Sequence, residues 1–367
     1  MSREHNIEAV ARQFQMGGEL VSAAPYGAGH INDTYCVTLH DKGLPGRYIL
    51  QRINHSVFQN PIAVMENIQR VTSHLAAKVL FEPERDRLVL SLVPARDGPT
   101  WHVDSDGNYW RAYRFIEEAH SYDAIETDEQ AFEGAKAIGR FQQLLVDLPA
   151  PRLHETIKNF HNTPMRFKAL EDAIATDLAG RVREAGPEIV FALSRKAIGS
   201  ILLEANLPER ITHNDTKFNN VLIDDATGQG ICVIDLDTVM PGLALHDFGD
   251  LVRTATSPVN EDERDLSKVT MRLSMFEAIV RGYLSSAGGF LTKEEKQYLV
   301  FSGKLMTFEQ GIRFLTDFLS GDAYYKVHRK EQNLDRCRTQ FKLMDSIERQ
   351  EAEMSRIVEC VIAGKTS

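Results

Sequence analysis

Cysteine is scarce in this chain, and its few copies lie far apart. None of the four cysteines, Cys36, Cys232, Cys337 and Cys360, belongs to a C-x-x-C pair. Disulfide frameworks and cysteine-based metal clusters depend on numerous or closely spaced cysteines, so both are disfavoured. We expect free thiols in a reducing compartment and therefore a cytoplasmic protein.

The chain also lacks long apolar runs and a surplus of basic residues. No stretch reaches the roughly 18 apolar residues of a membrane-spanning helix, and the opening M-S-R-E-H-N does not resemble a signal peptide. The formal net charge is −10, whereas nucleic-acid binders normally carry a basic surplus. We expect neither a membrane nor a nucleic acid as partner.

What remains is the composition of an ordinary globular protein, with 367 residues, 43% hydrophobic and 26% charged. The first part of the chain favours strands. They are expected at residues 19–22, 32–39, 47–53, 88–93, 100–104 and 109–116, with turns at 41–46 and at Asp106-Gly107. Helices are expected over 7–14, ending before Gly17-Gly18, and from Asn60-Pro61 onward.

Beyond Glu117 the pattern becomes helical. Helices are expected over 128–148, from the capping box of Thr292 and Glu295 toward Leu319, and over 333–362. The clear strands in this part are 221–224 and 231–235. We therefore expect an α+β fold, with a strand-rich N-terminal lobe over 1–116, a hinge near 115–119 and a mainly helical C-terminal lobe over 117–367.

The most informative segment is I-T-H-N-D-T-K-F-N-N-V-L-I-D, residues 211–224. Its Asp215 and Asn220 have the spacing of the Asp and Asn in the protein-kinase catalytic loop, H-R-D-L-x-x-x-N. A strand, a turn and a second strand follow, and this second strand ends at Asp235. The sequence thus predicts phosphoryl transfer, with Asp215 as catalytic carboxylate, Lys217 beside the γ-phosphate, and Asn220 and Asp235 as oxygen ligands of Mg²⁺.

Other interpretations of these residues are open. The Asp and Asn residues could be solvated turn formers, and His213 is expected to fix the loop by a backbone hydrogen bond. The D-F-G string at Asp247 resembles a magnesium motif, but it lies outside the strand-end context, so we expect Asp247 to brace the loop or cap a helix. Asp237 is a weaker candidate for a metal or sugar contact.

The candidate phosphate loop is P-Y-G-A-G-H-I-N-D-T-Y, residues 25–35. Gly27 and Gly29 would let backbone amides approach phosphate oxygens, with Asn32 close by; a simple hairpin turn is the alternative. Where protein kinases carry a strand lysine, this chain has Gln51 and Arg52. Arg52 could clamp phosphate, paired with Glu66, or be an exposed strand arginine. Phe115 and Glu117 in the hinge complete the candidate ATP-binding residues.

The chain resembles the aminoglycoside phosphotransferase and choline kinase superfamily, and within it the bacterial N-acetylhexosamine 1-kinases. The resemblance covers nearly the whole chain and is carried by P-Y-G-x-G-H-I-N, F-H-N-T-P-M-R-F, T-H-N-D-T-K-F-N-N, V-I-D-L-D-T-V-M-P-G, G-I-R-F-L and G-D-A-Y-Y. It implies a bilobal protein-kinase-like fold that uses ATP and Mg²⁺ to phosphorylate the anomeric hydroxyl of N-acetylglucosamine or N-acetylgalactosamine, in a monomer.

The resemblance also implies sugar-binding residues. It places His30, Asp215, Arg313 and Tyr324 near the sugar, with Thr238 and Met240 in a segment that could line the same pocket. From the residues alone, Arg313 could instead form a structural ion pair with Asp317 four residues later, and Tyr324 could be a loop aromatic that packs on the core.

Two rival functions remain. One is a kinase for another small hydroxyl acceptor such as an aminoglycoside, choline or homoserine, and the acidic stretch 117–133 could attract a cationic acceptor. The other is a non-catalytic pseudokinase that serves as a binding module, which the missing strand lysine motivates.

Overall fold

The computed structural model describes residues 5–27, 31–41, 44–122 and 124–365. The chain divides into two compact units, and neither is one continuous segment. The first unit comprises Met1–Ala119, Asp147–Lys158 and Cys232–Met240, and the second comprises His120–Val146, Asn159–Ile231 and Pro241–Ser367. Two short segments from later in the chain thus return to the strand-rich first unit, which a division into two consecutive lobes does not anticipate.

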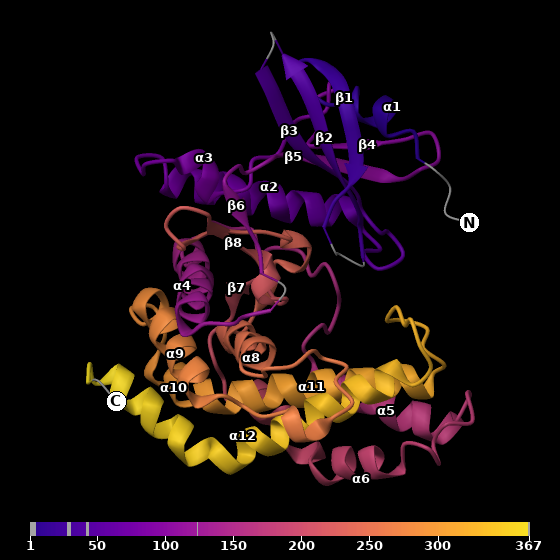
Figure 1. The fold of residues 1–367 in the computed structure, drawn as a ribbon, viewed down its shortest axis with the longest axis vertical. Helices are drawn as coiled ribbons and strands as arrows, with labels where there is room; N and C mark the ends of the chain where they lie inside the picture. Colours follow the sequence, from indigo (N-terminus) through magenta and orange to yellow (C-terminus); the bar gives the residue numbers. More distant parts are fainter. Residues whose placement is uncertain (1–4, 28–30, 42–43, 123, 366–367) are drawn as a thin grey trace. The chain divides into compact units, whose positions relative to one another are not determined.

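The first unit is built on an antiparallel sheet in the strand order β1-β2-β3-β5-β4. The strands lie side by side in the indigo and purple part of the ribbon (Figure 1). Alternating side chains of the central strands, among them Val37, Leu50 and Trp110, are buried in one cluster. The bounds are β1 Glu19–Pro25, β2 Asp33–Asp41, β3 Leu44–Arg52, β4 Trp101–Val103 and β5 Tyr109–Arg114.

Three helices belong to the first unit: α1 Ile7–Ala11, α2 Pro61–Lys78 and α3 Arg85–Leu88. α2 begins as the sequence predicts, because the Asn60 side chain accepts the backbone N–H of Ala63 at 3.1 Å. α1 is shorter than expected. The predicted strand over 88–93 is wrong: its start belongs to α3, and the bridge between Leu92 and Tyr113 stands outside any strand.

The second unit is mainly helical, as expected. α4 packs on α9, and α11 packs on α8 and α12, which runs beside it in Figure 1. The capping box of Thr292 and Glu295 is confirmed, but the helix expected after it is interrupted at Tyr298. The bounds are α4 Asp128–Leu145, α5 Thr163–Thr176, α6 Gly186–Ser194, α7 Ile201–Glu204, α8 Ala244–Ala255, α9 Leu273–Ala287, α10 Lys293–Gln297, α11 Leu299–Leu319 and α12 Gln332–Ile362.

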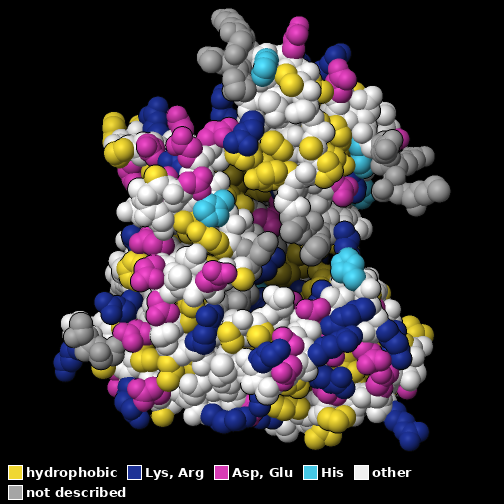
Figure 2. Space-filling model, in the orientation of Figure 1, with side chains coloured by type: hydrophobic (Ala, Val, Ile, Leu, Met, Phe, Trp, Pro, Cys, Tyr) yellow, Lys and Arg dark blue, Asp and Glu magenta, His cyan; other side chains and the backbone are white. Residues whose placement is uncertain are grey.

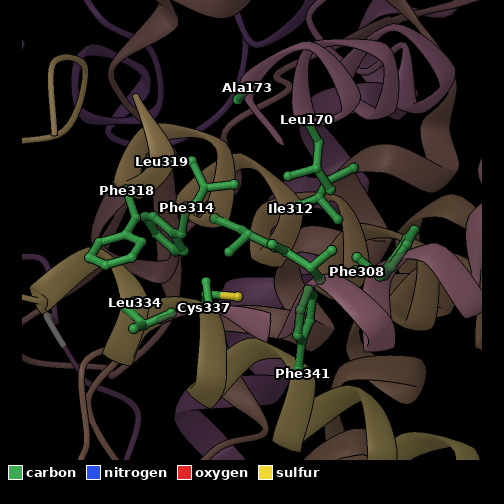
Figure 3. Close-up of a cluster of buried hydrophobic side chains, with 14 of the residues drawn as sticks. Leu170, Ala173, Phe308, Ile312, Phe314, Phe318, Leu319, Leu334, Cys337 and Phe341 are labelled. Atoms are coloured by element: carbon green, nitrogen blue, oxygen red, sulfur yellow. The ribbon is translucent and has the colours of Figure 1, made fainter. Parts of the chain in front are cut away.

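A cluster of buried side chains joins α5, α6, α11 and α12. Figure 3 shows Phe308, Ile312 and Phe314 of α11 facing Cys337 and Phe341 of α12. Cys337 is fully buried among apolar groups, so it packs as a small hydrophobic residue. All four cysteines are free thiols, as the sequence predicts.

Five short strands, β6 to β10, flank the loops that hold Asp215, Asn220 and Asp235. β8 matches the predicted strand over 221–224, whereas β9 ends at Val233, two residues before the predicted end at Asp235, and β7 and β10 were not anticipated. Their bounds are β6 Ala119–His120, β7 Arg210–Thr212, β8 Val221–Asp224, β9 Gly230–Val233 and β10 Met240–Gly242. The expected α+β fold, with an antiparallel strand-rich N-terminal part and a helical C-terminal part, is confirmed.

The visible surface of the helical unit carries Lys and Arg side chains interspersed with Asp and Glu (Figure 2). Charges of both signs are therefore mixed on this face. Among the described residues, none of the helices combines the length and the apolar character needed to cross a bilayer.

Candidate active site

The loop after β7 is held in place by hydrogen bonds to the carboxylate of Asp247. The buried Asp247, in α8, accepts hydrogen bonds from the backbone N–H groups of His213 (2.8 Å) and Asn214 (2.7 Å). Gln142 of α4 donates a third bond to the same carboxylate at 2.7 Å. Asp247 therefore braces the loop, one of its two expected roles, and it does not cap α8, whose first turn has no side-chain cap.

Asp215 occupies a position set by its neighbours. Its backbone N–H donates to Nδ1 of the buried His213 at 3.3 Å, which is the loop-fixing role expected for that histidine. Its carboxylate lies 3.1 Å from Nζ of Lys217. Burial would raise the pKa of Asp215, but Lys217 and His213 together lower it below the ordinary value. The carboxylate is thus ionised at neutral pH and can accept a hydrogen bond.

Asn220 ends the short 3₁₀ turn Phe218–Asn220 that leads into β8. Its Nδ2 donates to the backbone carbonyl of Asp215 at 2.8 Å. Because the amide nitrogen is directed at the loop, the amide oxygen is the atom that can serve a cation.

A buried ion pair supports the same loop. Nε2 of His161 donates to the carbonyl oxygen of Asn214 at 3.0 Å, and Nδ1 lies 2.8 Å from the Glu309 carboxylate. Both ring nitrogens face acceptors, so the ring donates at both. Thr163 also donates to Glu309, at 2.6 Å. Burial opposes ionisation of Glu309, but His161 and the other partners lower its pKa to about 2.

Arg313 of α11 does not pair with Asp317, so the structural alternative for it is wrong. The guanidinium donates to Gln310 at 3.0 Å and lies over the rings of Phe160 and Tyr325. The Asp317 carboxylate instead accepts the backbone N–H groups of Tyr324 and Tyr325, because the chain turns back over it after α11.

Arg166 lies close to Arg313. Its guanidinium donates to the Phe160 carbonyl at 2.9 Å, and burial and the charge of Arg313 lower the pKa of Arg166. Within the described part of the chain no carboxylate forms an ion pair with either arginine. Tyr324 is 53% exposed and does not pack on the core, where Tyr325 packs against Phe314 instead.

In the first unit, Asp235 follows β9 in the left-handed conformation, with φ of 60°. A non-glycine residue in this region is uncommon and points to a functional constraint. Thr238 ends the next short turn and is buried. Asp237 lies between them, and its carboxylate binds Arg111 and accepts from Asn32 at 2.6 Å.

Arg111 of β5 was missed by the sequence analysis. It is fully buried, pairs with Asp237 and donates through Nε to Gln51 at 3.0 Å. Burial would lower the pKa of Arg111, but the neighbouring carboxylates raise it, so the guanidinium stays charged. The signal in the sequence was a charged residue among the apolar and aromatic residues of W-R-A-Y.

The glycine loop is described in part. Gly27 has φ of 77°, and a side chain at this position would meet nothing within 4 Å. Gly29 and His30 lie outside the described residues. Asn32 accepts the backbone N–H of Asn54 at 3.0 Å through its Oδ1, which anchors the end of the loop to the chain after β3.

Arg52 does not pair with Glu66. It donates to Asp33 at 2.8 Å, because the two residues are directly opposite in the β2–β3 register, and Glu66 binds His154 instead. Of the hinge candidates, Phe115 lies under the guanidinium of Arg47 and edge-on to Tyr26, and Glu117 accepts from Arg47 at 2.9 Å.

The chain matches a known protein family over residues 22–269, described as the phosphotransferase enzyme family. Solved structures with a similar fold include an aminoglycoside phosphotransferase from Alicyclobacillus acidocaldarius, 12% identical over 98% of each chain with a TM-score of 0.61. Spectinomycin phosphotransferase APH(9)-Ia, solved with ADP and spectinomycin, is 10% identical over 98% of this chain and 99% of that chain, with a TM-score of 0.60.

A microcompartment-associated aminopropanol kinase is 17% identical over 95% of this chain and 98% of that chain, with a TM-score of 0.55. At such identities these structures show a shared fold. The family match covers more than half of the residues. This chain therefore belongs to the phosphotransferase enzyme family and is a small-molecule phosphotransferase.

Proposed function

We propose that this protein transfers the γ-phosphoryl group of ATP to the anomeric hydroxyl of an N-acetylhexosamine, giving the sugar 1-phosphate, in the cytoplasm. The observation that carries the proposal is the loop around Asp215. A scaffold protein would not need an ionised carboxylate beside a lysine in a loop braced from below by Asp247 and His161. Such pre-organisation is what phosphoryl transfer requires, because its catalysis is mostly positioning and electrostatics.

Each residue of the loop has a proposed role. Asp215 accepts a hydrogen bond from the sugar hydroxyl and directs its oxygen at the γ-phosphorus. Lys217 stabilises the negative charge on the transferring phosphoryl group. As the bond between the sugar oxygen and the γ-phosphorus forms, the bond between that phosphorus and the β,γ-bridging oxygen breaks and ADP leaves, while the hydroxyl proton passes to Asp215.

The oxygen donors of Asn220 and Asp235 fit Mg²⁺, which prefers carboxylate and carbonyl ligands and keeps phosphate oxygens and waters in its shell. When bound, Mg²⁺ would neutralise charge on the β- and γ-phosphates. We propose that the glycine loop, Asn32, Phe115 and Glu117 contribute to nucleotide binding.

The acceptor is proposed to be neutral because of the two arginines near the expected sugar residues. Arg166 and Arg313 are both partly buried, and neither forms an ion pair with a carboxylate in the described region, although the charge of Glu309 acts on both. A cationic acceptor would be repelled by such a pair. Guanidinium groups donate readily to the hydroxyl and amide oxygens of an acetylated sugar. We propose that His30, Thr238 and Tyr324 also line the sugar site.

The test is an acceptor screen with wild-type protein and the Asp215→Asn variant. ADP release is measured with MgATP and free sugars, aminoglycosides, choline and homoserine, and the products are analysed by phosphorus NMR. We expect a doublet from a sugar 1-phosphate with N-acetylglucosamine or N-acetylgalactosamine, and none from the variant. A signal only from a 6-phosphate, or turnover only with a cationic acceptor, would overturn the sugar assignment.

A further inference from the structure

The strand position that carries lysine in protein kinases holds an amide in this chain. Gln51 of β3 is followed by Arg52, whose guanidinium is used on Asp33. Directly opposite Gln51 on the neighbouring strand lies Arg111, its partner in the β3–β5 register. The Gln51 Oε1 accepts from Nε of Arg111 at 3.0 Å. A fixed cation is therefore present one strand away from the expected position.

Arg111 is joined to two segments that the proposed function assigns to MgATP. Its Nη1 binds one oxygen of Asp237, and the other oxygen accepts from Asn32 at 2.6 Å. Asp237 is two residues beyond Asp235, and Asn32 closes the glycine loop. One buried carboxylate thus links the proposed metal segment to the proposed phosphate loop, and Arg111 holds that carboxylate in place.

The cluster is also incomplete. The hydroxyl of Tyr113, two residues along β5 and on the same side as Arg111, is buried and has no hydrogen-bond partner in the described structure. Its ring lies 5.4 Å from the Arg111 guanidinium. Buried hydroxyls normally have partners, and an unsatisfied one calls for an explanation such as a ligand or water. The Tyr113 hydroxyl can therefore accept or donate a further hydrogen bond, to water or to a ligand group, beside Arg111.

We propose that Arg111 replaces the strand lysine, as the buried cation that positions the Asp235–Asp237 segment and the glycine loop for the phosphates of MgATP. Arg111 is a positioning residue, because it is fully buried and two of its nitrogens already bind protein groups. Its charge lowers the electrostatic cost of bringing phosphates next to two aspartates. The proposal rests on the proposed kinase function for the identity of the ligand.

A purely structural ion pair is the competing explanation. Removing one partner of a buried pair destabilises a protein whether or not a ligand binds there. The two explanations differ when the charge is moved rather than removed. If the charge of Arg111 serves only folding, a lysine at position 51 does not raise the nucleotide affinity of the Arg111→Met protein. If the cation serves the phosphates, a lysine at 51 restores affinity.

The test measures ADP binding by calorimetry, with Mg²⁺ and with EDTA, alongside thermal unfolding. Arg111→Met is expected to weaken MgADP binding by about tenfold or more, and Arg111→Lys by less. Gln51→Lys/Arg111→Met should regain most of this loss, whereas the matched pair Gln51→Met/Arg111→Met should not. Arg114→Met is the control, because Arg114 is an exposed arginine of the same strand on the opposite face.

Unchanged MgADP affinity in a folded Arg111→Met protein would overturn the proposal. So would a Gln51→Lys/Arg111→Met protein that binds no better than the matched pair, and this comparison holds even if the single Met variant fails to fold. The binding experiment contains no phosphoryl acceptor, so its result does not depend on whether the acceptor is an N-acetylhexosamine. Wild-type protein that binds no nucleotide would refute the proposed kinase function itself.

Discussion

The buried pair of His161 and Glu309 offers a quantitative test of how the Asp215 loop is supported. The two side chains are 6% and 1% exposed, and their nitrogen and oxygen lie 2.8 Å apart. Removing one member of a buried pair costs about 3–5 kcal/mol, because the other charge is left without compensation. We expect His161→Phe and Glu309→Met each to lower the unfolding free energy by an amount in this range.

The double variant His161→Phe/Glu309→Met leaves no uncompensated charge. Its cost should therefore be close to that of one single variant rather than to the sum of the two, with a coupling energy of about 3–5 kcal/mol. The loss of the Thr163 hydrogen bond occurs in both Glu309 variants, so it cancels in the cycle. A matched surface control is Arg356→Met, whose pair with Glu353 is exposed and should contribute less than about 1 kcal/mol.

The assay is urea unfolding followed by far-ultraviolet circular dichroism, which reports mainly the helical second unit. The tryptophans Trp101 and Trp110 lie in the first unit, so their fluorescence follows that unit separately. Additive single costs, with a coupling energy near zero, would refute the ion pair. The double variant should still lose turnover, because the hydrogen bond from His161 to the Asn214 carbonyl is gone.

Three further predictions follow from buried groups and close packing. Burial lowers the pKa of His246 to about 3, so between about pH 6.5 and 3 this side chain is neutral in the folded protein but protonated in the unfolded chain. Stability should fall as the pH drops from about 6.5 toward 3, by about 4 kcal/mol, and His246→Gln should flatten this dependence in acid-unfolding curves. Gly282→Ala places a Cβ 2.1 Å from the Phe132 carbonyl oxygen, whereas Gly289→Ala meets nothing within 4 Å. The first should cost about 1–3 kcal/mol and the second less than about 0.5 in urea unfolding; equal costs would contradict the α4–α9 packing. Tyr113→Phe should leave the melting temperature unchanged or higher, because it removes a buried hydroxyl without a partner; a clear decrease would show that the hydroxyl is satisfied.

Local motifs in the sequence predicted more of the site than long-range partners did. The spacing of Asp215 and Asn220 and the caps at Asn60 and Thr292 each depend on a few neighbouring residues, and the sequence displays them directly. Register is different. Nothing in the local sequence shows that Asp33 lies opposite Arg52, and so the pairing of Arg52 with Glu66 was expected instead.

The errors in the fold have the same origin. The run L-V-L-S-L-V has the composition of a strand, but only its second half, from Ser91 to Val93, pairs with β5. Its first residue belongs to α3. Arg111 was missed because a single arginine in a strand is usually exposed. Only the tertiary structure brings it to Asp237, 126 residues later in the chain.

That long separation has a consequence for the order in which the chain can fold. A ribosome delivers the five strands of the sheet well before it delivers the segment Cys232–Met240 that completes the first unit. Until then the Arg111 guanidinium lacks the carboxylate with which it pairs in the folded protein. The nascent strands should remain loosely organised, within reach of chaperones and proteases, and a fragment cut after Ala119 should be a poor starting point for isolating the first unit.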